Sequence, residues 1–152
     1  MNILEILVAN KIITEQISSM LQLYSEEWGF SHFEAVIRTC ILSENDLLDV
    51  ISTELSLTHL FSIEHSDLKS SSCQRIDFRD ACNLLCFNLG ESDGFYDIVV
   101  NNPLDGDLQN FLSSRFEKYN ILIAEKQLIL DAAIEFYELK AKLPTFNKVY
   151  DE

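Results

Sequence analysis

Basic residues are scarce in this chain of 152 residues: 11 Lys and Arg stand against 25 Asp and Glu, which gives a formal net charge of −14. A field of that sign repels nucleic acid, anionic membranes and phosphorylated ligands unless a local basic patch overrides it. The densest basic segment is a group of three lysines near the C-terminus, Lys140, Lys142 and Lys148, and such a group is typical of a solvated tail. We therefore expect no nucleic-acid partner.

Glycine is also rare, and the four glycines form no phosphate-binding loop, since none is followed by Gly-Lys-Ser/Thr. The four cysteines form no CxxC pair and the three histidines have no paired spacing, so the sequence predicts no metal site. No local motif joins a histidine to a serine or cysteine nucleophile. The sequence thus names no catalytic residue, no metal ligand and no cofactor, and we expect a protein that is not an enzyme.

Long hydrophobic runs are absent too. None approaches the ~20 residues that span a bilayer, and residues 1–13 lack the basic start and small-residue cleavage site of a signal peptide. We expect no direct membrane insertion. Cys40 and Cys86 lie within apolar runs, which indicates reduced, mostly buried thiols of a cytoplasmic protein. Apolar residues make up 47% of the chain, which is enough for a folded core.

The strongest feature that is present is a repeated pair of helices. In residues 33–57 an apolar segment, a tight break and an amphipathic helix follow one another, and Ser43 is a good N-cap for the second helix. Helical spacing marks the buried face of that helix at Leu47, Val50, Ile51 and Leu55. Residues 3–24 repeat this order with Thr14 at the cap, 29 residues before Ser43. A repeat of this length predicts one helix pair beside another.

The second half of the chain has strand patterns. Residues 84–89 and 95–101 read as two strands joined by a turn at Gly94, and they should pair as a hairpin. A helix over residues 104–116, a strand over 119–124 and a last helix from Glu125 follow. This order predicts a three-stranded sheet with both helices on one face.

The fold class is therefore α+β: an N-terminal helical bundle of two helix-pair repeats, followed by a small three-stranded sheet with two helices. We expect four segments. They are a helical subdomain over residues 1–63, a connecting loop and short helix over 64–83, an α+β subdomain over 84–138, and an exit linker or tail over 139–152.

Three aromatic residues lie in or beside the segment between the repeats: Trp28, Phe30 and Phe33. Large aromatic residues dominate cores, so we interpret them first as a wedge between the two helix pairs. The alternative is a partner-binding patch with the pair Glu26-Glu27 as its charged rim. Within this cluster we expect Trp28 in the core and Phe30 as the exposed contact.

The doubled helix pattern resembles the N-terminal domain of type II secretion and type IV pilus assembly ATPases, whose cyclic di-GMP-binding version is called the MshEN domain. The second half extends the resemblance over nearly the whole chain. Its hairpin runs into the turn Asn102-Pro103-Leu104-Asp105, and a helix, a strand and a closing amphipathic helix follow. The resemblance implies a domain that joins a motor ATPase, or another effector, to a partner at the cytoplasmic face of the inner membrane.

The nucleotide-binding motifs of the MshEN version are replaced in this chain. In that version each repeat opens with Arg-Leu-Gly, carries a glycine before the hydrophobic pair and closes with glutamine. An arginine can stack on guanine, and glycines let the backbone approach a ligand. The corresponding positions are Asn2-Ile3-Leu4, Lys11 and Tyr24 in the first repeat, and Ser31-His32-Phe33, Cys40 and Glu54 in the second. We therefore expect no binding of cyclic di-GMP.

The sequence predicts a non-enzymatic docking or regulatory domain for a protein partner, such as the cytoplasmic part of an inner-membrane secretion or pilus component. The domain would be cytoplasmic, and peripheral to the inner membrane only through that partner. Trp28, Phe30 and Phe33 are the candidate contact residues. The alternative is a cyclic di-GMP-sensing MshEN domain with divergent motifs. The third class is a small enzyme, and no residue of the sequence can be assigned a catalytic role in it.

Overall fold

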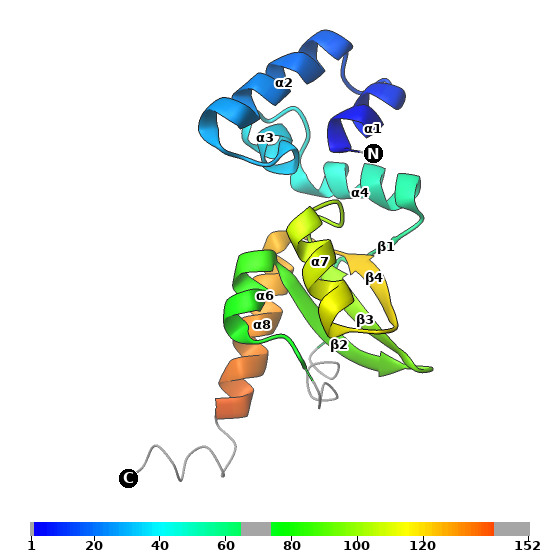
Figure 1. The fold of residues 1–152 in the computed structure, drawn as a ribbon, viewed down its shortest axis with the longest axis vertical. Coiled ribbons are helices and arrows are strands. Elements are labelled where there is room, and N and C mark those ends of the chain that lie inside the picture. Colours follow the sequence, from blue (N-terminus) through cyan, green and yellow to red (C-terminus); the bar gives the residue numbers. More distant parts are fainter. Residues whose placement is uncertain (1, 65–73, 142–152) are drawn as a thin grey trace. The chain divides into compact units, whose positions relative to one another are not determined.

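The computed structural model describes residues 2–64 and 74–141, and the chain divides into two compact units, residues 1–59 and 60–152 (Figure 1). The predicted α+β class is confirmed, because the first unit is helical and the second combines helices with a sheet. The predicted loop after Glu64 and the predicted tail after Ala141 lie outside the described residues.

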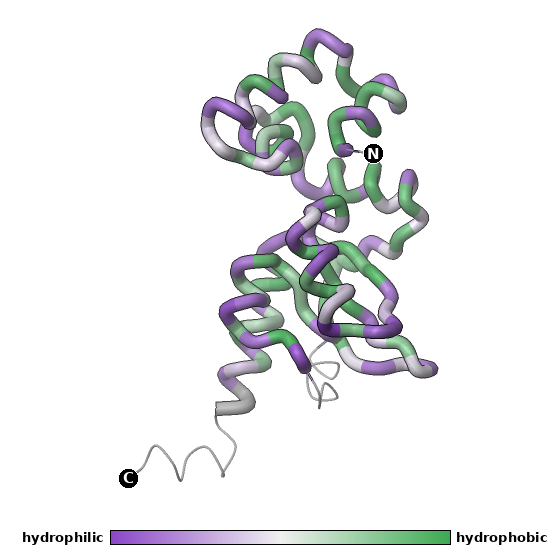
Figure 2. The backbone as a smooth tube through the Cα atoms, viewed as in Figure 1, coloured by the Kyte–Doolittle hydropathy of each residue, from purple (hydrophilic) through white to green (hydrophobic). Residues whose placement is uncertain are grey.

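The first unit contains two pairs of helices and ends in a short strand. The elements are α1 (Ile3–Ala9), α2 (Glu15–Trp28), α3 (His32–Arg38), α4 (Glu44–Leu55) and β1 (Thr58–His59). Helix α1 packs against each of the other three helices. Leu7 and Val36 occupy equivalent positions in the two pairs and are both fully buried, and along these helices hydrophobic segments alternate with hydrophilic ones (Figure 2). The repeat predicted from the sequence is thus built around one shared core.

The described residues of the second unit form a mixed sheet with three helices. Its elements are α6 (Phe78–Leu84), β2 (Cys86–Ser92), β3 (Phe95–Val100), α7 (Gly106–Arg115), β4 (Tyr119–Ile123) and α8 (Lys126–Ala141). The strand order is β1-β4-β3-β2. Strands β2 and β3 form the predicted antiparallel hairpin, whose register shifts between Asn88 and Gly90. Strands β3 and β4 are parallel, with α7 in the connection between them.

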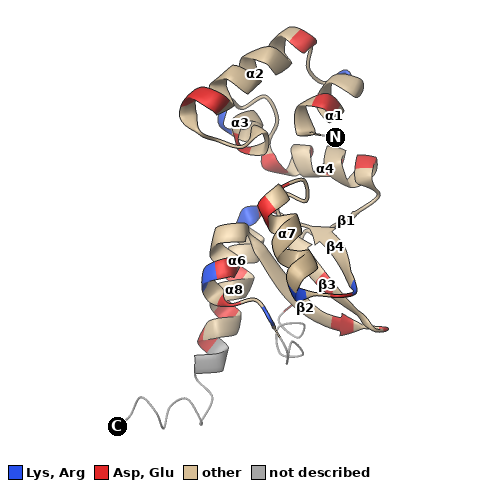
Figure 3. Ribbon diagram, in the orientation of Figure 1, with Lys and Arg blue, Asp and Glu red and all other residues tan. Residues whose placement is uncertain are grey.

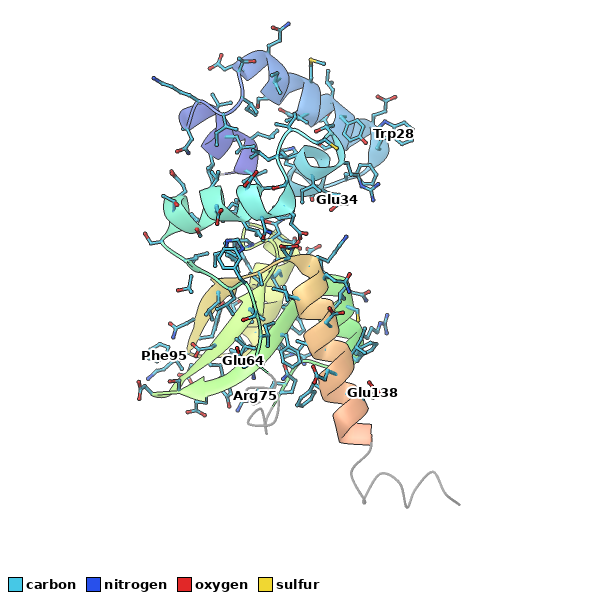
Figure 4. All side chains as sticks on the ribbon, turned by 180° about the vertical axis from the view of Figure 1, so that it is seen from behind. Trp28, Glu34, Glu64, Arg75, Phe95 and Glu138 are labelled. Atoms are coloured by element: carbon cyan, nitrogen blue, oxygen red, sulfur yellow. The ribbon has the colours of Figure 1, made fainter. Side chains whose placement is uncertain are left out.

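The prediction of three strands with both helices on one face is wrong in two respects. Strand β1 adds a fourth strand; residues 57–63 have a short β-leaning sequence, but they were not predicted to join the sheet. Helices α7 and α8 lie on opposite faces of the sheet (Figures 1 and 4). In β3 the residues Ile98–Val100 are all buried. Alternate side chains of a strand point to opposite faces of the sheet, so helices must cover both faces.

Aromatic contacts link the sheet to these helices. Phe116, which follows α7, lies 5.3 Å from Tyr96 of β3 between ring centroids. Phe136 of α8 contacts Phe87 of β2 at 5.6 Å, and Phe87 pairs with Val99 across the hairpin. Tyr96 and Val99 are an odd number of residues apart along β3, so the two contacts fall on different faces of the sheet.

The boundary between α6 and β2 differs from the predicted strand over residues 84–89. Helix α6 continues to Leu84, and Leu85 adopts a left-handed backbone with φ 54 at the helix end. Strand β2 therefore begins at Cys86. A left-handed leucine is uncommon, so the sequence carries no signal for a helix end at this position.

At the outer strand β2, the side chain of Gln74 makes hydrogen bonds to the backbone of Asn88, as a neighbouring strand would. Gln74 Nε2 donates to the Asn88 carbonyl oxygen at 2.8 Å, and the Asn88 backbone N–H donates to Gln74 Oε1 at 2.8 Å. The Asn88 side chain donates to the Gln74 carbonyl oxygen at 3.0 Å and accepts from the Gly90 N–H at 2.9 Å. Both side chains are buried, so this network satisfies polar backbone groups that an open edge would leave unpaired.

Candidate protein-docking surface

The two helix pairs of the first unit begin with matching caps. Asn2 Oδ1 accepts from the third backbone N–H of α1 at 3.0 Å, and Ser31 Oγ does the same for α3 at 3.1 Å. Thr14 caps α2 at 3.2 Å and Ser43 caps α4 at 3.1 Å. Each pair of caps is separated by 29 residues. The predicted caps at Thr14 and Ser43 are confirmed, and the repeat extends to the first helix of each pair.

The turns inside the two pairs also have the same backbone. Lys11 and Cys40, again 29 residues apart, are both left-handed with φ 59. The N–H of Lys11 donates to the Val8 carbonyl oxygen at 3.0 Å, and the N–H of Cys40 donates to the Ile37 carbonyl oxygen at 3.0 Å. The resemblance places glycines of the MshEN pattern at these two positions, and this chain adopts a left-handed backbone there without glycine. Cys40 is exposed, so the expectation that it is buried is wrong, whereas Cys86 is buried as expected.

The outward surfaces of the two pairs differ. On α2 the side chains of Met20 and Leu23 are each 64% exposed, and Ile17 is 37% exposed. On α4 the residues 29 positions after Ile17 and Met20 are Asp46 and Asp49, which are exposed acids. The two helix pairs therefore share a backbone arrangement, but α2 presents an apolar face and α4 an acidic one.

The structure does not bring the three predicted contact residues together on one surface. Trp28 is 64% exposed, so its interpretation as a core residue is wrong, and Figure 4 shows it at the outside of the first unit. It stands on the last turn of α2, where Gly29 reverses the chain with φ 74, and its ring contacts only Tyr24 among the described aromatic pairs. Phe33 is 3% exposed and belongs to the core.

Phe30 takes an intermediate position and is half-buried. Its ring lies 5.9 Å from Tyr24, and the Arg38 guanidinium lies 4.1 Å above it. Arg38 also pairs with Glu34 at 3.0 Å. Phe30 thus joins the end of α2 to α3, and the guanidinium over its ring shields part of it from a ligand.

Sequence reasoning missed Met20 and Leu23. A signal was present, because the apolar residues of α2 cover more of the helix circumference than one buried face requires. Only Leu21 and Ser25 of α2 are buried, and Ile17, Met20 and Trp28 lie beside that face or beyond it. An excess of apolar positions on one helix, compared with its repeat partner, marks this candidate surface.

The charge around the apolar face of α2 is mainly negative. Residues 1–59 hold nine acidic residues and two basic ones, Lys11 and Arg38, a formal charge of −7. Figure 3 shows acidic residues along these helices and few basic ones. Helix α2 itself carries Glu15, Glu26 and Glu27, all exposed, and no lysine or arginine. Glu26 and Glu27 lie three and four residues after Leu23, so they place negative charge beside the C-terminal part of the apolar face. Glu15 lies two residues before Ile17 and points to another side of the helix.

Among the described residues of the second unit, Cys86 is a poor candidate for a nucleophile. Burial, with a smaller contribution from the charge of Asp80, raises the pKa of the Cys86 thiol to about 12. A thiol with so high a pKa stays protonated at neutral pH, and the thiolate is the reactive form. Within residues 2–64 and 74–141 no group of three potential metal ligands occurs, and no helix there is long and apolar enough to cross a bilayer.

These features belong to a fold seen in solved structures of other proteins. MshE, in a structure with cyclic di-GMP (cdg), matches with a TM-score of 0.72 at 21% sequence identity, over 90% of this chain and 99% of that one. The N-terminal domain of XpsE matches with a TM-score of 0.57 at 16% identity, over 86% and 90% of the two chains. Neither a protein-family model nor a curated protein matches the sequence. The resemblance predicted from the sequence is thus confirmed as a likeness of fold.

Proposed function

We propose that this chain is a non-enzymatic docking domain that binds a protein partner. The observation that carries the proposal is the apolar outer face of α2, where Met20, Leu23 and Trp28 are each 64% exposed. Such residues are common singly on a surface, but several on one helix mark an interaction site. The family resemblance implies the class of partner: the cytoplasmic part of an inner-membrane secretion or pilus component, which would hold the domain at the membrane without inserting it.

The test is the isolation of complexes from the native cells. The full chain, carrying an affinity tag, is crosslinked in those cells, purified and analysed by mass spectrometry beside the tag alone. We expect one protein to be recovered in an amount comparable to the bait. If the bait enriches no protein over the tag alone, the docking function fails.

A second candidate function is the sensing of cyclic di-GMP, and two observations favour it. MshE, which has this fold, is described in a structure with that ligand. Lys11 and Cys40, at two glycine positions of the pattern, have a left-handed backbone, a conformation that glycine adopts readily. Against it, the other two glycine positions of the pattern hold Leu4 and Phe33, whose buried side chains occupy the space beside the backbone.

Titration calorimetry with cyclic di-GMP decides between these functions. If the chain is a docking domain alone, micromolar ligand should give no saturable heat. A saturable isotherm that Leu4→Gly and Phe33→Gly leave unchanged would establish nucleotide sensing through contacts other than the MshEN pattern. The melting temperature of each variant serves as the control for folding.

A further inference from the structure

The outer face of α2 has the shape of a helix-docking surface. Ile17, Met20, Tyr24 and Trp28 follow one another at spacings of three and four residues, which places them along one side of the helix. Leu23 widens this stripe. From Ile17 to Trp28 the stripe runs for about 16 Å, or roughly three turns, at the rise of an α-helix. A partner helix of three to four turns covers that length when ridges of side chains pack into grooves.

The side chains suit a binding site. Trp28 offers a large aromatic anchor at one end, and such anchors supply most of the free energy of protein interfaces. Met20 lies near the middle of the stripe and can adapt its unbranched side chain to a partner surface. By contrast, the second repeat shows acids at two of the equivalent positions, Asp46 and Asp49, so the stripe is not a requirement of the repeat fold.

Charge selects among the possible occupants. Two copies of α2 placed face to face would each bring Glu26 and Glu27 into the contact, with no lysine or arginine on the helix to compensate. An anionic membrane surface would meet the same repulsion. A helix with basic residues beside its apolar stripe has a complementary charge, and its association would be fast at low salt.

We propose that the face of α2 formed by Ile17, Met20, Leu23 and Trp28 binds a basic amphipathic helix of a partner protein, an inference that rests on the docking function above. The apolar stripe of that helix lies along α2, and its lysine or arginine residues lie beside Glu26-Glu27. The exposed apolar stripe and its acidic border together define this partner.

The chain contains its own reporter, because Trp28 is its single tryptophan. The probe is a synthetic helical peptide of four turns without tryptophan, with a leucine stripe flanked by lysines. One control peptide has glutamates in place of the lysines, and a second keeps the lysines but has serines in the stripe. We expect the first peptide alone to shift Trp28 emission to shorter wavelength, and its affinity to fall as salt is raised.

Substitutions on α2 test whether the peptide binds there. Met20→Glu and Leu23→Glu should each weaken binding by about tenfold or more, because a charge replaces a buried apolar contact. The matched control is Ile134→Glu in α8, because Ile134 is another exposed apolar residue, 50% exposed, and belongs to the second unit. That control should bind as the unsubstituted chain does. Melting temperatures establish that each variant is folded.

Several results would overturn the inference. One is equal binding of the lysine and glutamate peptides, or binding that neither α2 variant weakens. Dimers in sedimentation that Leu23→Glu dissociates would make a second copy the occupant, and binding to anionic phospholipid vesicles through α2 would make it a membrane. Capture of a native partner equally well by Leu23→Glu would overturn the role of α2 but leave the docking function intact.

Discussion

Gln74 is one residue on which an edge of the sheet depends. If alanine replaces it, the buried backbone of Asn88 loses the two hydrogen bonds that the Gln74 amide makes with it. Each such hydrogen bond contributes about 0.5–1.5 kcal/mol, so Gln74→Ala should lower the free energy of unfolding of the second unit by roughly 1–3 kcal/mol. Urea denaturation measures the loss, and hydrogen exchange at the Asn88 amide should become faster.

The control for Gln74 is Gln127→Ala on α8, which removes an exposed hydrogen bond to Asp131. We expect a change within about 0.5 kcal/mol for that variant, as for most surface substitutions. Equal urea midpoints for Gln74→Ala and Gln127→Ala would mean that water replaces the Gln74 amide at the sheet edge.

Lys11 and Cys40 are the residues at which the repeat retains a left-handed backbone without glycine. A left-handed conformation costs a non-glycine residue roughly 1–2 kcal/mol. We therefore expect Lys11→Gly and Cys40→Gly each to be more stable than the matched Lys11→Ala and Cys40→Ala by up to about 1 kcal/mol, since the greater freedom of unfolded glycine offsets part of the gain. Thermal melts of the four variants test this, and alanine variants as stable as the glycine variants would contradict it.

At this scale the sequence predicted some local features and not others. Thr14 and Ser43 were recognisable as caps, because a hydroxyl before a helix has one strongly preferred role. The left-handed turns at Lys11 and Cys40 were invisible, because neither residue type favours positive φ. Trp28 was misplaced because large aromatic residues are usually buried, whereas here its side chain is 64% exposed on the last turn of α2.

Helix α2 has two faces whose contributions to stability should differ. Leu21 is 3% exposed and Leu23 is 64% exposed on the same helix. Leu21→Ala should lower the free energy of unfolding of the first unit by about 2–5 kcal/mol, as truncation of a buried leucine does. Leu23→Ala should change it by no more than about 0.5 kcal/mol. The two variants are matched in chemistry, and comparable losses in a urea titration would show that Leu23 is buried in solution.

At the scale of helices and strands, sequence patterns predicted which elements form but not which of their residues other elements cover. Helical spacing located α2 and α4, and β-branched and aromatic composition located β3 and β4. The placing of α7 and α8 on opposite faces of the sheet did not follow, because it depends on the parallel pairing of β3 with β4. The docking face of α2 was equally hidden, since a stripe of apolar residues in a sequence does not reveal which residues other helices cover.

The whole molecule should lose stability in alkaline solution. Burial, aided by the charges of Asp77 and Asp80, raises the pKa of Tyr137 from 10.0 to about 12, and the pKa of Cys86 rises from 9.0 to about 12. The folded state therefore holds these protons more tightly than the unfolded chain does. Their stabilising contribution is complete below pH 9 and is lost as the pH rises from 9 to 12. Urea unfolding at successive pH values in this range measures the loss.

Tyr137→Phe isolates the tyrosine contribution. The ring contacts with Phe78 and Phe136 remain, but the hydrogen bond from the Tyr137 hydroxyl to the Ile76 carbonyl oxygen is removed. We expect a stability lower by about 1 kcal/mol at neutral pH and a shallower decline in alkali. A variant whose alkaline decline matches that of the unsubstituted chain would exclude a role for this phenol.

The duplicated turns of the first unit have a consequence for binding stoichiometry. A ligand that recognises the backbone shape at Lys11 and Cys40 finds two equivalent places in every chain. A ligand that recognises the side chains of α2 finds one, because α4 carries Asp46 and Asp49 at the equivalent positions. The number of ligand molecules bound per chain at saturation therefore shows what a ligand recognises. Two indicate the backbone that the two repeats share, and one indicates the surface of α2, which differs from that of α4.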